Sequence, residues 1–451
     1  MMQRRRVDKY RSYLGVTLGE ALVMHLSRSE ERMRGLYCLR RSVLFVTTIF
    51  TLFGDANPAV GIPGASDDGE KCYRATHPEA VIRHCSQTIS SAKLPPKAMA
   101  MAFYRRANAY NQKSESDRAI QDYNEAIRLN PGYADAFANR GAAYARKRDY
   151  ERAMQDYDEA IRLNPRHADA FSNRGVVYAR KKDYERAIQD YDEAIRLNPD
   201  HIGALYARGN AYRRRGDYDQ AVRNYDQVVR LNPRHAQAYS NRGLTYAAKG
   251  QDNLAIQDYD EAIRINPEHV NAYYNRGNAY RRTGAYGKAV ENYSQVIRLN
   301  PKHGNGYSSR GMVRFYQGQF TSAAADFSEA RRFAPDNLYL ALLLHVAEAR
   351  AGIPGQAVQT EMARRGDLES WPGPILAMFV GKLPEHVILN AGNSSDQPEK
   401  RCQAYFYLGQ KRLMQQKKSE AAEMFRQAVA TQASTLFEFE AAGAELSRLR
   451  N

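Results

Sequence analysis

The sequence predicts an all-α protein, a solenoid of helix-turn-helix repeats that ends in a capping helix. Three observations support this prediction. Apolar and small residues recur at spacings that place them on one face of a helix. Whole phrases return, so that DYERAMQDYDEAIRLNP at 149–165 reappears almost unchanged at 183–199. Finally, a proline recurs every 34 residues, at Pro131, Pro165, Pro199, Pro233, Pro267, Pro301 and Pro335. A fixed period of this length indicates stacked copies of one supersecondary unit.

Residues 1–61 are expected to be an upstream extension followed by a signal peptide that begins near Met33. Three arginines between 34 and 41 precede an apolar stretch from Ser42 to Phe53, and small residues follow. This stretch is too short to cross a bilayer comfortably, so no stable membrane span is expected after processing. A short buried helix or a retained membrane anchor is the alternative. Cys38 precedes the apolar stretch, so it is misplaced for lipid attachment.

Residues 62–99 are expected to form a shortened first hairpin with a cysteine pair. Cys72 and Cys85 are 13 residues apart, which is also the spacing of Tyr144 and Tyr157 in a later repeat. On a single helix this spacing would separate them by roughly 20 Å, whereas on two facing helices the residues meet. We therefore predict a disulfide, which suits an exported protein. Two buried reduced thiols are the alternative.

Seven repeats of 34 residues occupy 100–337. Position 4 is large and apolar or aromatic, position 8 is small and position 11 is mostly tyrosine, while positions 20, 24 and 27 are alanine, an aromatic residue, and alanine or valine. Positions 4, 8 and 11 share one helical face and positions 20, 24 and 27 another, so the small residues let two helices approach closely. Position 1 is Ala100, Ala134, Ala168, Ile202, Ala236, Val270 and Gly304.

Turn and capping residues recur in the same register. Asparagine and proline at positions 31 and 32 end the second helix, and a glycine, lysine or arginine ends the first. The expected terminating glycines are Gly216, Gly250, Gly284 and Gly318. The expected N-caps of the second helix are Asp149, Asp183 and Asp217.

With this period and signature, the chain resembles the tetratricopeptide repeat (TPR) family over about 238 residues. The resemblance implies a superhelical solenoid that binds extended peptides along a concave groove lined by first helices. Asparagine at position 6 would bond the peptide backbone, because its amide offers both a donor and an acceptor; a solvated helix surface is the alternative. The position-6 residues are Asn139, Asn173, Asn241 and Asn275. Asn108, Asn210 and Asn278 at position 9, with Arg146, Arg180, Arg214 and Arg282 at position 13, are expected on or near the same surface.

Two further rows of residues are expected to be structural. Histidine recurs at position 34, but equivalent atoms in stacked helices lie too far apart to share a metal, so we expect loop residues and no metal site. Arginine recurs at position 7, where ion pairs with the acid at position 23 are favoured over a row of anion-binding guanidiniums. Asparagine replaces that acid opposite Arg208 and Arg276, so these two arginines are predicted to be free.

Residues 338–401 are expected to be a degenerate helical segment and a polar linker, and residues 402–451 a final TPR-like hairpin with the capping helix. This region is similar to the periplasmic new-lipoprotein-I type of TPR adaptor, in the Trp371-Pro372 stretch, FVGKLPE from Phe379, YFYLGQ from Tyr405 and AELSRL from Ala444. The resemblance implies a scaffold for cell-wall hydrolases and a processing protease. The chain departs from it by lacking a lipid-attachment cysteine and by having more regular repeats.

The sequence therefore predicts a non-catalytic protein-interaction scaffold or adaptor in a bacterial cell envelope, in the periplasm or secreted. No cofactor is expected, and no motif of a nucleotide-binding loop, a zinc protease or a serine hydrolase is present. The formal charge of +16 is compatible with acidic partners or anionic polymers. We expect protein partners and no nucleic acid, and the oligomeric state stays open. The alternative is a structural subunit of an export or secretion assembly, whose groove would be apolar and already filled.

Overall fold

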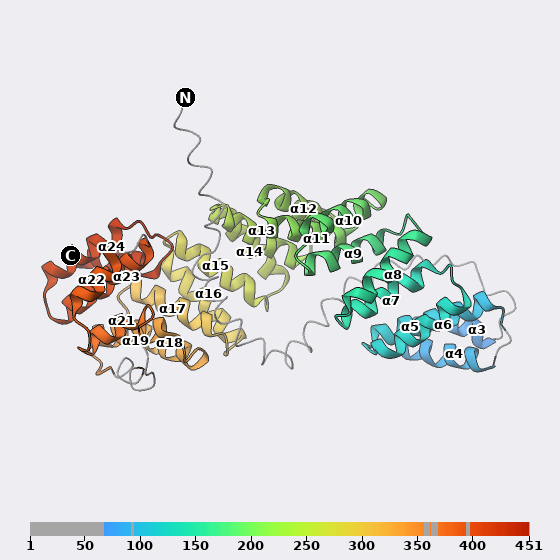
Figure 1. The fold of residues 1–451 in the computed structure, drawn as a ribbon, viewed down its shortest axis with the longest axis horizontal. Helices are drawn as coiled ribbons and strands as arrows, with labels where there is room; N and C mark the ends of the chain where they lie inside the picture. Colours follow the sequence, from blue (N-terminus) through green and yellow to red (C-terminus); the bar gives the residue numbers. More distant parts are fainter. Residues whose placement is uncertain (1–66, 92–93, 356–360, 362–368, 394–396, 451) are drawn as a thin grey trace, which may run out of the picture. The chain divides into compact units, whose positions relative to one another are not determined.

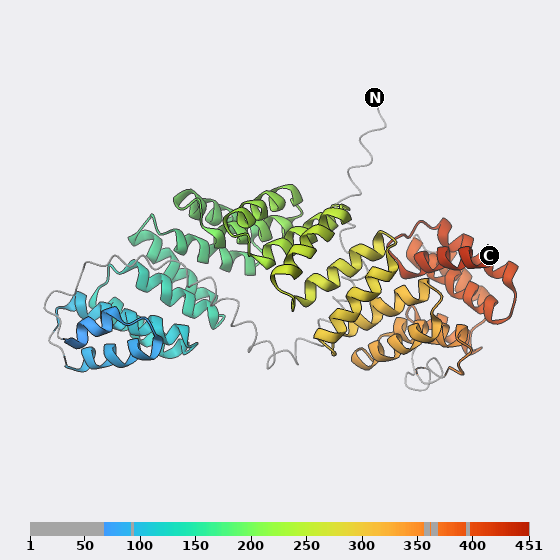
Figure 2. The same ribbon diagram turned by 180° about the vertical axis from the view of Figure 1, so that it is seen from behind.

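The computed structural model describes residues 67–91, 94–355, 361, 369–393 and 397–450, and every regular element in these ranges is a helix (Figures 1 and 2). The predicted signal peptide lies outside the described residues. The chain divides between Thr245 and Tyr246 into two units, each considered by itself. We call the described residues 67–245 the N-terminal unit and 246–450 the C-terminal unit.

The N-terminal unit is a stack of helical hairpins in which odd-numbered helices come first and even-numbered helices second. Each hairpin packs on the next, as α6 does on α7 and α10 on α11. The helices are α3 (Asp67–Arg74), α4 (Pro78–Ser91), α5 (Pro96–Gln112), α6 (Ser116–Leu129), α7 (Ala134–Arg146), α8 (Tyr150–Leu163), α9 (Ala168–Arg180), α10 (Tyr184–Leu197), α11 (Ile202–Arg215), α12 (Tyr218–Leu231) and α13 (Ala236–Ala248), whose last residues belong to the C-terminal unit.

The small residue at position 8 lies against the aromatic ring at position 24. A methyl group placed on Gly175 would approach the Tyr191 ring to 2.7 Å, and Gly209 is equally close to Tyr225, at 2.8 Å. The rings of Tyr191 and Tyr225 are completely buried or nearly so. The two helices of a hairpin therefore approach closely because glycine leaves room for the ring, as the sequence pattern predicted.

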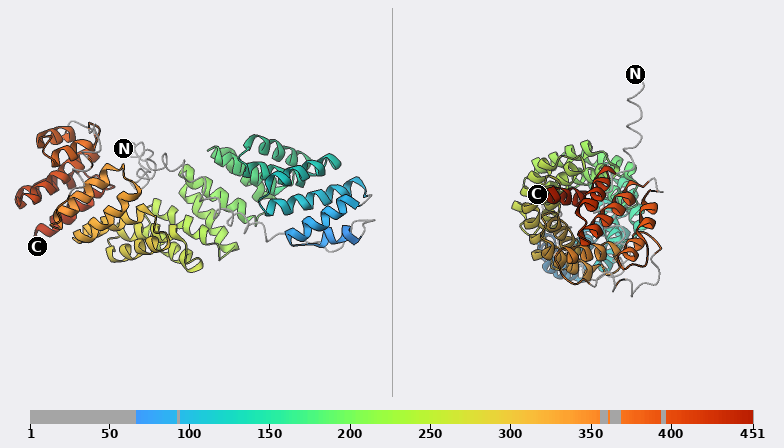
Figure 3. Two further views of the ribbon diagram at one scale, coloured as in Figure 1. Left: turned by 90° about the horizontal axis from the view of Figure 1, so that it is seen from below. Right: turned by 90° about the vertical axis from the view of Figure 1, so that its left-hand side faces the viewer.

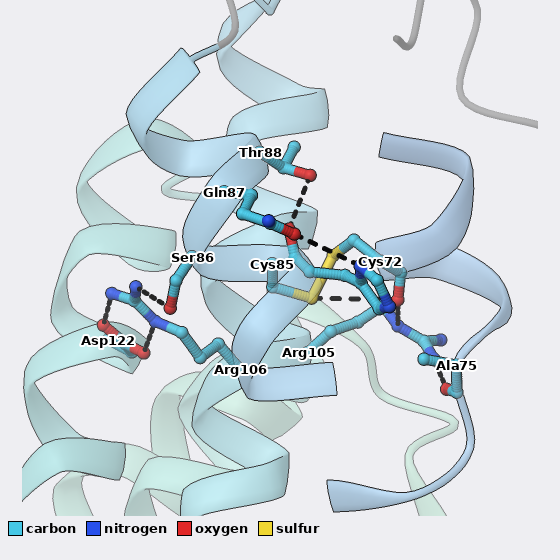
Figure 4. Close-up of a disulfide and its surroundings, with 10 residues drawn as sticks. Cys72, Ala75, Cys85, Ser86, Gln87, Thr88, Arg105, Arg106 and Asp122 are labelled. Carbon is cyan, nitrogen blue, oxygen red and sulfur yellow. Dashed lines mark hydrogen bonds and ion pairs between the residues drawn. A yellow bond between two sulfur atoms is a disulfide. The ribbon is translucent and has the colours of Figure 1, made fainter. Parts of the chain in front are cut away.

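The first hairpin is closed by the predicted disulfide between Cys72 and Cys85, on α3 and α4 (Figure 4). Both cysteines are fully buried, beside Val81. Arg105 of α5 donates to the carbonyl oxygens of Cys72 at 3.1 Å and Ala75 at 2.8 Å, which ties the end of α3 to the next hairpin. The cysteine pair thus occupies the place that an aromatic ring takes in the later hairpins.

Position-7 arginines join consecutive hairpins. Arg174 binds both carboxylate oxygens of Asp190 in its own repeat, at 2.9 and 2.7 Å, and also Asp158 of the preceding repeat at 2.6 Å. The side chains of Arg174 and Asp190 are 20% and 8% exposed, so the pair is largely shielded from water. Arg140 makes the corresponding contacts with Asp156 and Asn124. The structural ion pair expected from the sequence is confirmed.

The prediction that Arg208 and Arg276 are free was wrong. Arg208 donates to Asn224 at 2.8 Å and pairs with Asp192 of the preceding repeat. Arg276 binds Asn292 and Asp260 in the same way. The carboxylate at position 25 of the preceding repeat keeps each arginine paired when position 23 is asparagine.

The histidines at position 34 cap the first helices. His201 Nδ1 accepts from the backbone N–H of Ala204 at 3.2 Å, and its Nε2 lies 3.0 Å from Asp169 of the preceding repeat. The same capping bond is made by His167, His235, His269 and His303. Among the described residues, no group of three or more histidine, cysteine or acidic side chains is arranged to hold a metal ion.

The N-caps of the second helices follow the prediction in two of three cases. Asp149 and Asp183 accept from the backbone N–H groups of Arg152 and Arg186. Asp217 makes no side-chain capping bond and binds the Arg215 guanidinium instead, so the predicted cap is wrong there. The carboxylate of Asp217 thus binds a charged donor on the N-terminal side of the cap position, whereas Asp149 and Asp183 bind the backbone and the guanidinium of the arginine three residues later.

The turn after the first helix requires a left-handed residue. Gly216 has φ +93°, Gly250 +73° and Gly284 +75°, whereas Arg148 and Lys182 adopt +64° at the same position of earlier repeats. Side chains with a Cβ are disfavoured in this region by about 1–2 kcal/mol, partly offset by the greater flexibility of unfolded glycine.

The C-terminal unit continues with hairpins and then departs from the period. The predicted final hairpin is α23 and α24, where Gly409 packs on the Phe425 ring, and the predicted capping helix is α25 (Figure 3). The helices are α14 (Asp252–Ile265), α15 (Val270–Arg282), α16 (Tyr286–Leu299), α17 (Gly304–Tyr316), α18 (Phe320–Phe333), α19 (Leu338–Arg350), α21 (Gly373–Phe379), α22 (Glu385–Asn393), α23 (Pro398–Met414), α24 (Lys418–Ala430) and α25 (Phe437–Arg450).

Replacing Arg148 and Lys182 by glycine should stabilise the protein. The double variant Arg148→Gly, Lys182→Gly should gain about 0.5–1 kcal/mol per site, because each turn loses its left-handed strain. The denaturant midpoint measures the gain. Gly216→Ala is the matched reverse change and should lower the midpoint; equal midpoints for all three proteins would contradict the turn argument.

A second prediction about stability concerns the arginine clamp, by which we mean a position-7 arginine bound to side chains of its own and the preceding repeat. Asp190→Ala should cost about 2–3 kcal/mol, because Arg174 is left half-paired in a shielded place. Asp190→Asn should cost less than about 1 kcal/mol, because it reproduces the Arg208–Asn224 arrangement that the chain already contains. Chemical denaturation measures the free energy of unfolding of both variants. Equal losses of stability for Asp190→Ala and Asp190→Asn would show that an asparagine at position 23 does not replace the aspartate.

Candidate functional site

The first helices of the N-terminal unit lie on the inner side of its curve. Consecutive first helices pack on one another, as α5 on α7, α7 on α9 and α9 on α11, and no comparable packing joins consecutive second helices. In a curved stack the elements on the inside are the ones that come closest together. We call the exposed side of the first helices the inner surface; it carries the predicted groove residues.

Asn139 is engaged within the protein rather than free. Its side-chain Nδ2 donates to the Tyr104 hydroxyl at 2.9 Å and to Asn108 Oδ1 at 3.0 Å. Asn108 Oδ1 also accepts from the Tyr123 hydroxyl at 2.6 Å. The four side chains form a network that links repeat to repeat on the inner surface, so the donor of Asn139 is already used.

The same network recurs at Asn241. Its Nδ2 donates to the Tyr206 hydroxyl and to Asn210 Oδ1, both at 2.8 Å, and the Tyr225 hydroxyl donates to Asn210 Oδ1 at 2.8 Å. In the C-terminal unit, Asn278 likewise accepts from a tyrosine, Tyr293, at 2.8 Å. The sequence predicted that the asparagines at positions 6 and 9 would all be available to a peptide. The asparagines of these networks instead form hydrogen bonds within the protein and stabilise the stack.

Asn173 and Asn275 differ from the others. Neither side chain has a hydrogen-bond partner in the described part of the chain, and both are half-buried. Asn173 has no partner because the preceding repeat has Ala138 and Ala142 at the positions where the networks have tyrosine and asparagine. Asn173 and Asn275 are the position-6 residues that can still offer both a donor and an acceptor to a ligand.

The position-13 arginines divide in the same manner. Arg146 donates to the carbonyl and side-chain oxygens of Asn111, and Arg282 pairs with Asp252. Arg180 and Arg214 are exposed, and no hydrogen bond or ion pair holds either one within the described residues. The N-terminal unit thus has an unpartnered polar group on α9 and α11, made of Asn173, Arg180 and Arg214.

Helix α25 occupies the inner side of the C-terminal unit. It packs on α17 and α23, both first helices, in addition to its sequence neighbour α24. Three glutamates anchor it: Glu440 pairs with Arg281 of α15 at 2.5 Å, Glu445 pairs with Arg350 of α19, and Glu438 accepts from Tyr407 of α23 at 3.2 Å. Beside it lies a hollow of about 490 Å³ lined by Tyr286, Tyr316, Glu440 and Arg448, among others.

Sequence reasoning missed these acidic anchors. Glu438 and Glu445 are seven residues apart and share one helical face with Ala441 and Ala442, so the acids lie on the same face as the buried apolar residues. Acids on an otherwise apolar face are a signal of buried partners, because an unpaired buried carboxylate is costly. Arg213 and Arg281 at position 12 also carried no prediction from the sequence.

None of the described helices is both long enough and apolar enough to cross a membrane.

Family models for tetratricopeptide repeats match this chain at 107–148, 209–250 and 245–284 in one model, and at 139–202, 190–223 and 270–303 in three others. All of these residues lie within 107–303, and the similarity of the C-terminal third to a periplasmic adaptor stays a prediction. No curated protein sequence matches.

Solved structures of other repeat proteins are similar to parts of the chain. The structure entitled "YrrB: a TPR protein with an unusual peptide-binding site" is 28% identical, with a TM-score of 0.35, and covers 42% of this chain and 95% of its own. MamA from Desulfovibrio magneticus RS-1 is 25% identical, with a TM-score of 0.36, and covers 38% of this chain and 96% of its own. A tetratricopeptide repeat protein from Parabacteroides merdae is 21% identical, with a TM-score of 0.42, over 55% and 98%.

Protonation of Glu438 should make the stability of the C-terminal unit depend on pH. Burial raises the pKa of Glu438 to about 7, although hydrogen bonds from Tyr407 and Gln403 oppose the rise. Because the folded-state pKa is raised, the stabilising contribution is complete at low pH and is lost as pH rises towards and through 7. Glu438→Gln should therefore melt with less pH dependence than wild type between pH 5.5 and 8, and should be more stable than wild type at pH 8.

Melting curves of the two proteins across that interval test this. The control Glu440→Gln alters a partly exposed acid on the same helix and should keep the wild-type dependence. A wild-type slope that persists in Glu438→Gln would mean that another group is responsible.

Proposed function

We propose that this all-α solenoid, with tetratricopeptide repeats over residues 107–303, is a non-catalytic scaffold that binds extended protein segments on the inner surface of its N-terminal unit. The observation that carries the proposal is the unpartnered polar group of Asn173, Arg180 and Arg214. The neighbouring polar side chains of the inner surface, such as Asn139, Asn241 and Arg146, are engaged in hydrogen bonds. Polar groups without partners on an otherwise bonded surface are the ones available to a ligand.

The three side chains define the chemistry of the segment. A primary amide such as Asn173 can donate to one backbone carbonyl and accept from one backbone N–H of an extended chain. Two unpaired guanidiniums favour acidic side chains and attract them from a distance. A single exposed contact contributes only about 1 kcal/mol, so affinity requires several repeats acting on one segment.

The array is suited to this because its own bonds keep the repeats at a constant spacing. The arginine clamps and histidine caps recur once per repeat and fix each hairpin to its neighbour, as in the Arg174–Asp158 and His201–Asp169 pairs. Preorganisation of this kind lowers the entropy cost of binding.

We place the protein in the bacterial cell envelope, in the periplasm or secreted. The Cys72–Cys85 disulfide supports an oxidising compartment, and the basic and apolar order of residues 34–53 supports export. The resemblance of the C-terminal third makes cell-wall hydrolases and proteases the first partners to examine. The alternative of a structural export subunit calls for an apolar, filled groove, and the exposed Arg180 and Arg214 favour the adaptor.

Capture of partners from an envelope extract tests the function. The variant Asn173→Ala, Arg180→Ala, Arg214→Ala should lose at least about tenfold in affinity for the captured partner, because it removes three contacts of about 0.5–1.5 kcal/mol each. Its helicity and melting temperature should stay close to wild type, since none of the three side chains has a hydrogen bond or ion pair with another described residue.

The matched control is Arg196→Ala on the second helix α10, which removes an exposed, paired arginine away from the inner surface. It should bind as wild type does. A triple variant that captures the same partner undiminished would place the binding surface elsewhere.

A further inference from the structure

Two of the repeats are close copies of one another. In the copy that includes Arg281, this arginine is paired with a glutamate from another part of the same chain. RGNAYRR occurs at 208–214 and again at 276–282, 68 residues later. These are the two repeats in which position 12 is arginine, Arg213 in the first copy and Arg281 in the second. Arg281 pairs with Glu440 of α25.

Within their own repeats, the surroundings of the two arginines match closely. The ring centroids of Tyr206 and Tyr225 are 6.0 Å apart at 54°, and those of Tyr274 and Tyr293 are 5.9 Å apart at 54°. In each copy the position-24 tyrosine donates to the position-9 asparagine at 2.8 Å. Burial raises the pKa of both Tyr225 and Tyr293, and in each case the charge of the adjacent arginine, Arg213 or Arg281, opposes the rise. The guanidiniums therefore sit in equivalent places.

Their partners differ. Arg281 Nη1 lies 2.5 Å from both carboxylate oxygens of Glu440. Arg213 Nε is buried with no hydrogen-bond partner, and no carboxylate contacts Arg213 within the described residues. Next to it in the sequence, Arg214 is exposed and likewise has no acidic partner. One copy of the site is occupied by a glutamate, and the other has the same arginine without one.

We propose that Arg213 on α11 is a receptor for a glutamate on a helical segment of a partner protein, in the manner that α25 shows at Arg281. Helix α25 is the template for this ligand: an amphipathic helix with small residues and regularly placed acids, FEFEAAGAE from Phe437. A carboxylate that meets Arg213 as Glu440 meets Arg281 would form a charge-assisted hydrogen bond with the guanidinium Nη1, which favours an acid over a neutral side chain.

The occupant is a segment of another protein rather than α25 of a second copy. Within its own chain α25 is held by three acid contacts, to Arg281, Arg350 and Tyr407. Its Phe437 ring is stacked on Tyr316, with the centroids 5.3 Å apart. Releasing the helix would expose all of these groups at once, so α25 is committed to its own unit.

This inference shares with the proposed function the premise that the inner surface of the N-terminal unit receives a partner protein. It adds a helical, glutamate-bearing segment to the extended segment proposed at Asn173 and Arg180. A labelled synthetic peptide of residues 434–450 is the probe, titrated into the whole mature chain, whose own α25 keeps Arg281 occupied. We expect saturable binding that weakens about tenfold or more with Arg213→Gln, and equally with Glu440→Gln in the peptide.

A charge swap separates the contact from effects on folding. Arg213→Glu should abolish binding of the native peptide and should restore binding of a peptide that carries Glu440→Arg. Arg281→Gln in the protein should leave the native peptide bound through Arg213. Binding that is unaffected by Arg213→Gln, or a swap that rescues nothing, would overturn the proposal.

Two outcomes distinguish this proposal from the general one. If envelope partners are captured through Asn173 and Arg180 but are insensitive to Arg213→Gln, the scaffold function stands and the glutamate receptor is wrong. If the peptide binds through Arg213 but no envelope protein is captured, the receptor stands and the scaffold proposal fails. Displacement of the peptide by single-stranded DNA at equal charge, with no dependence on Glu440, would also overturn it by indicating a general polyanion surface.

Discussion

The contact between a glycine and a buried ring sets the dimensions of the whole array. A ring such as Tyr191 fills the space over Gly175, and the hairpin closes to a distance that only a small residue at position 8 allows, glycine in most repeats and Ala107 in the first. Once that distance is fixed, Arg174 can reach the acids of two consecutive hairpins and His201 can cap one helix while touching the previous repeat. Steric fit inside each hairpin thus comes first, and the polar contacts between hairpins follow from it.

The repeated part of the fold was readable because every repeat meets the same neighbours, so a fixed period translates directly into a fixed contact. The paired arginines and the disulfide followed from that register. The state of each asparagine did not, because it depends on residues about 31 to 35 positions earlier: Asn139 meets Tyr104 and Asn108, while Asn173 follows Ala138 and Ala142. Repeat position alone predicted the same role for every asparagine. The preceding repeat decides which of them form hydrogen bonds within the protein.

Helix α25 was predicted as a cap, and its acids give it a second role that periodicity cannot indicate. Glu438, Glu440 and Glu445 each meet a different first helix, on α23, α15 and α19. These contacts span 31 to 159 residues of sequence, and they leave no local signature beyond the presence of acids on an otherwise apolar face. The two units consequently differ in what their inner sides can do: one holds a segment of its own chain, and the other has unpaired polar groups.

The covalent bond at the first hairpin also has a consequence for how the molecule comes apart. In a stack where each repeat touches only its neighbours, the terminal repeats have one neighbour fewer and open first. Here α25 covers the last hairpin, and the link between Cys72 and Cys85 holds the first one together even when its packing loosens. Reduction would remove that constraint at one end only. Reduction therefore makes the N-terminal hairpin easier to open, and an opened hairpin is a site where a protease can cleave.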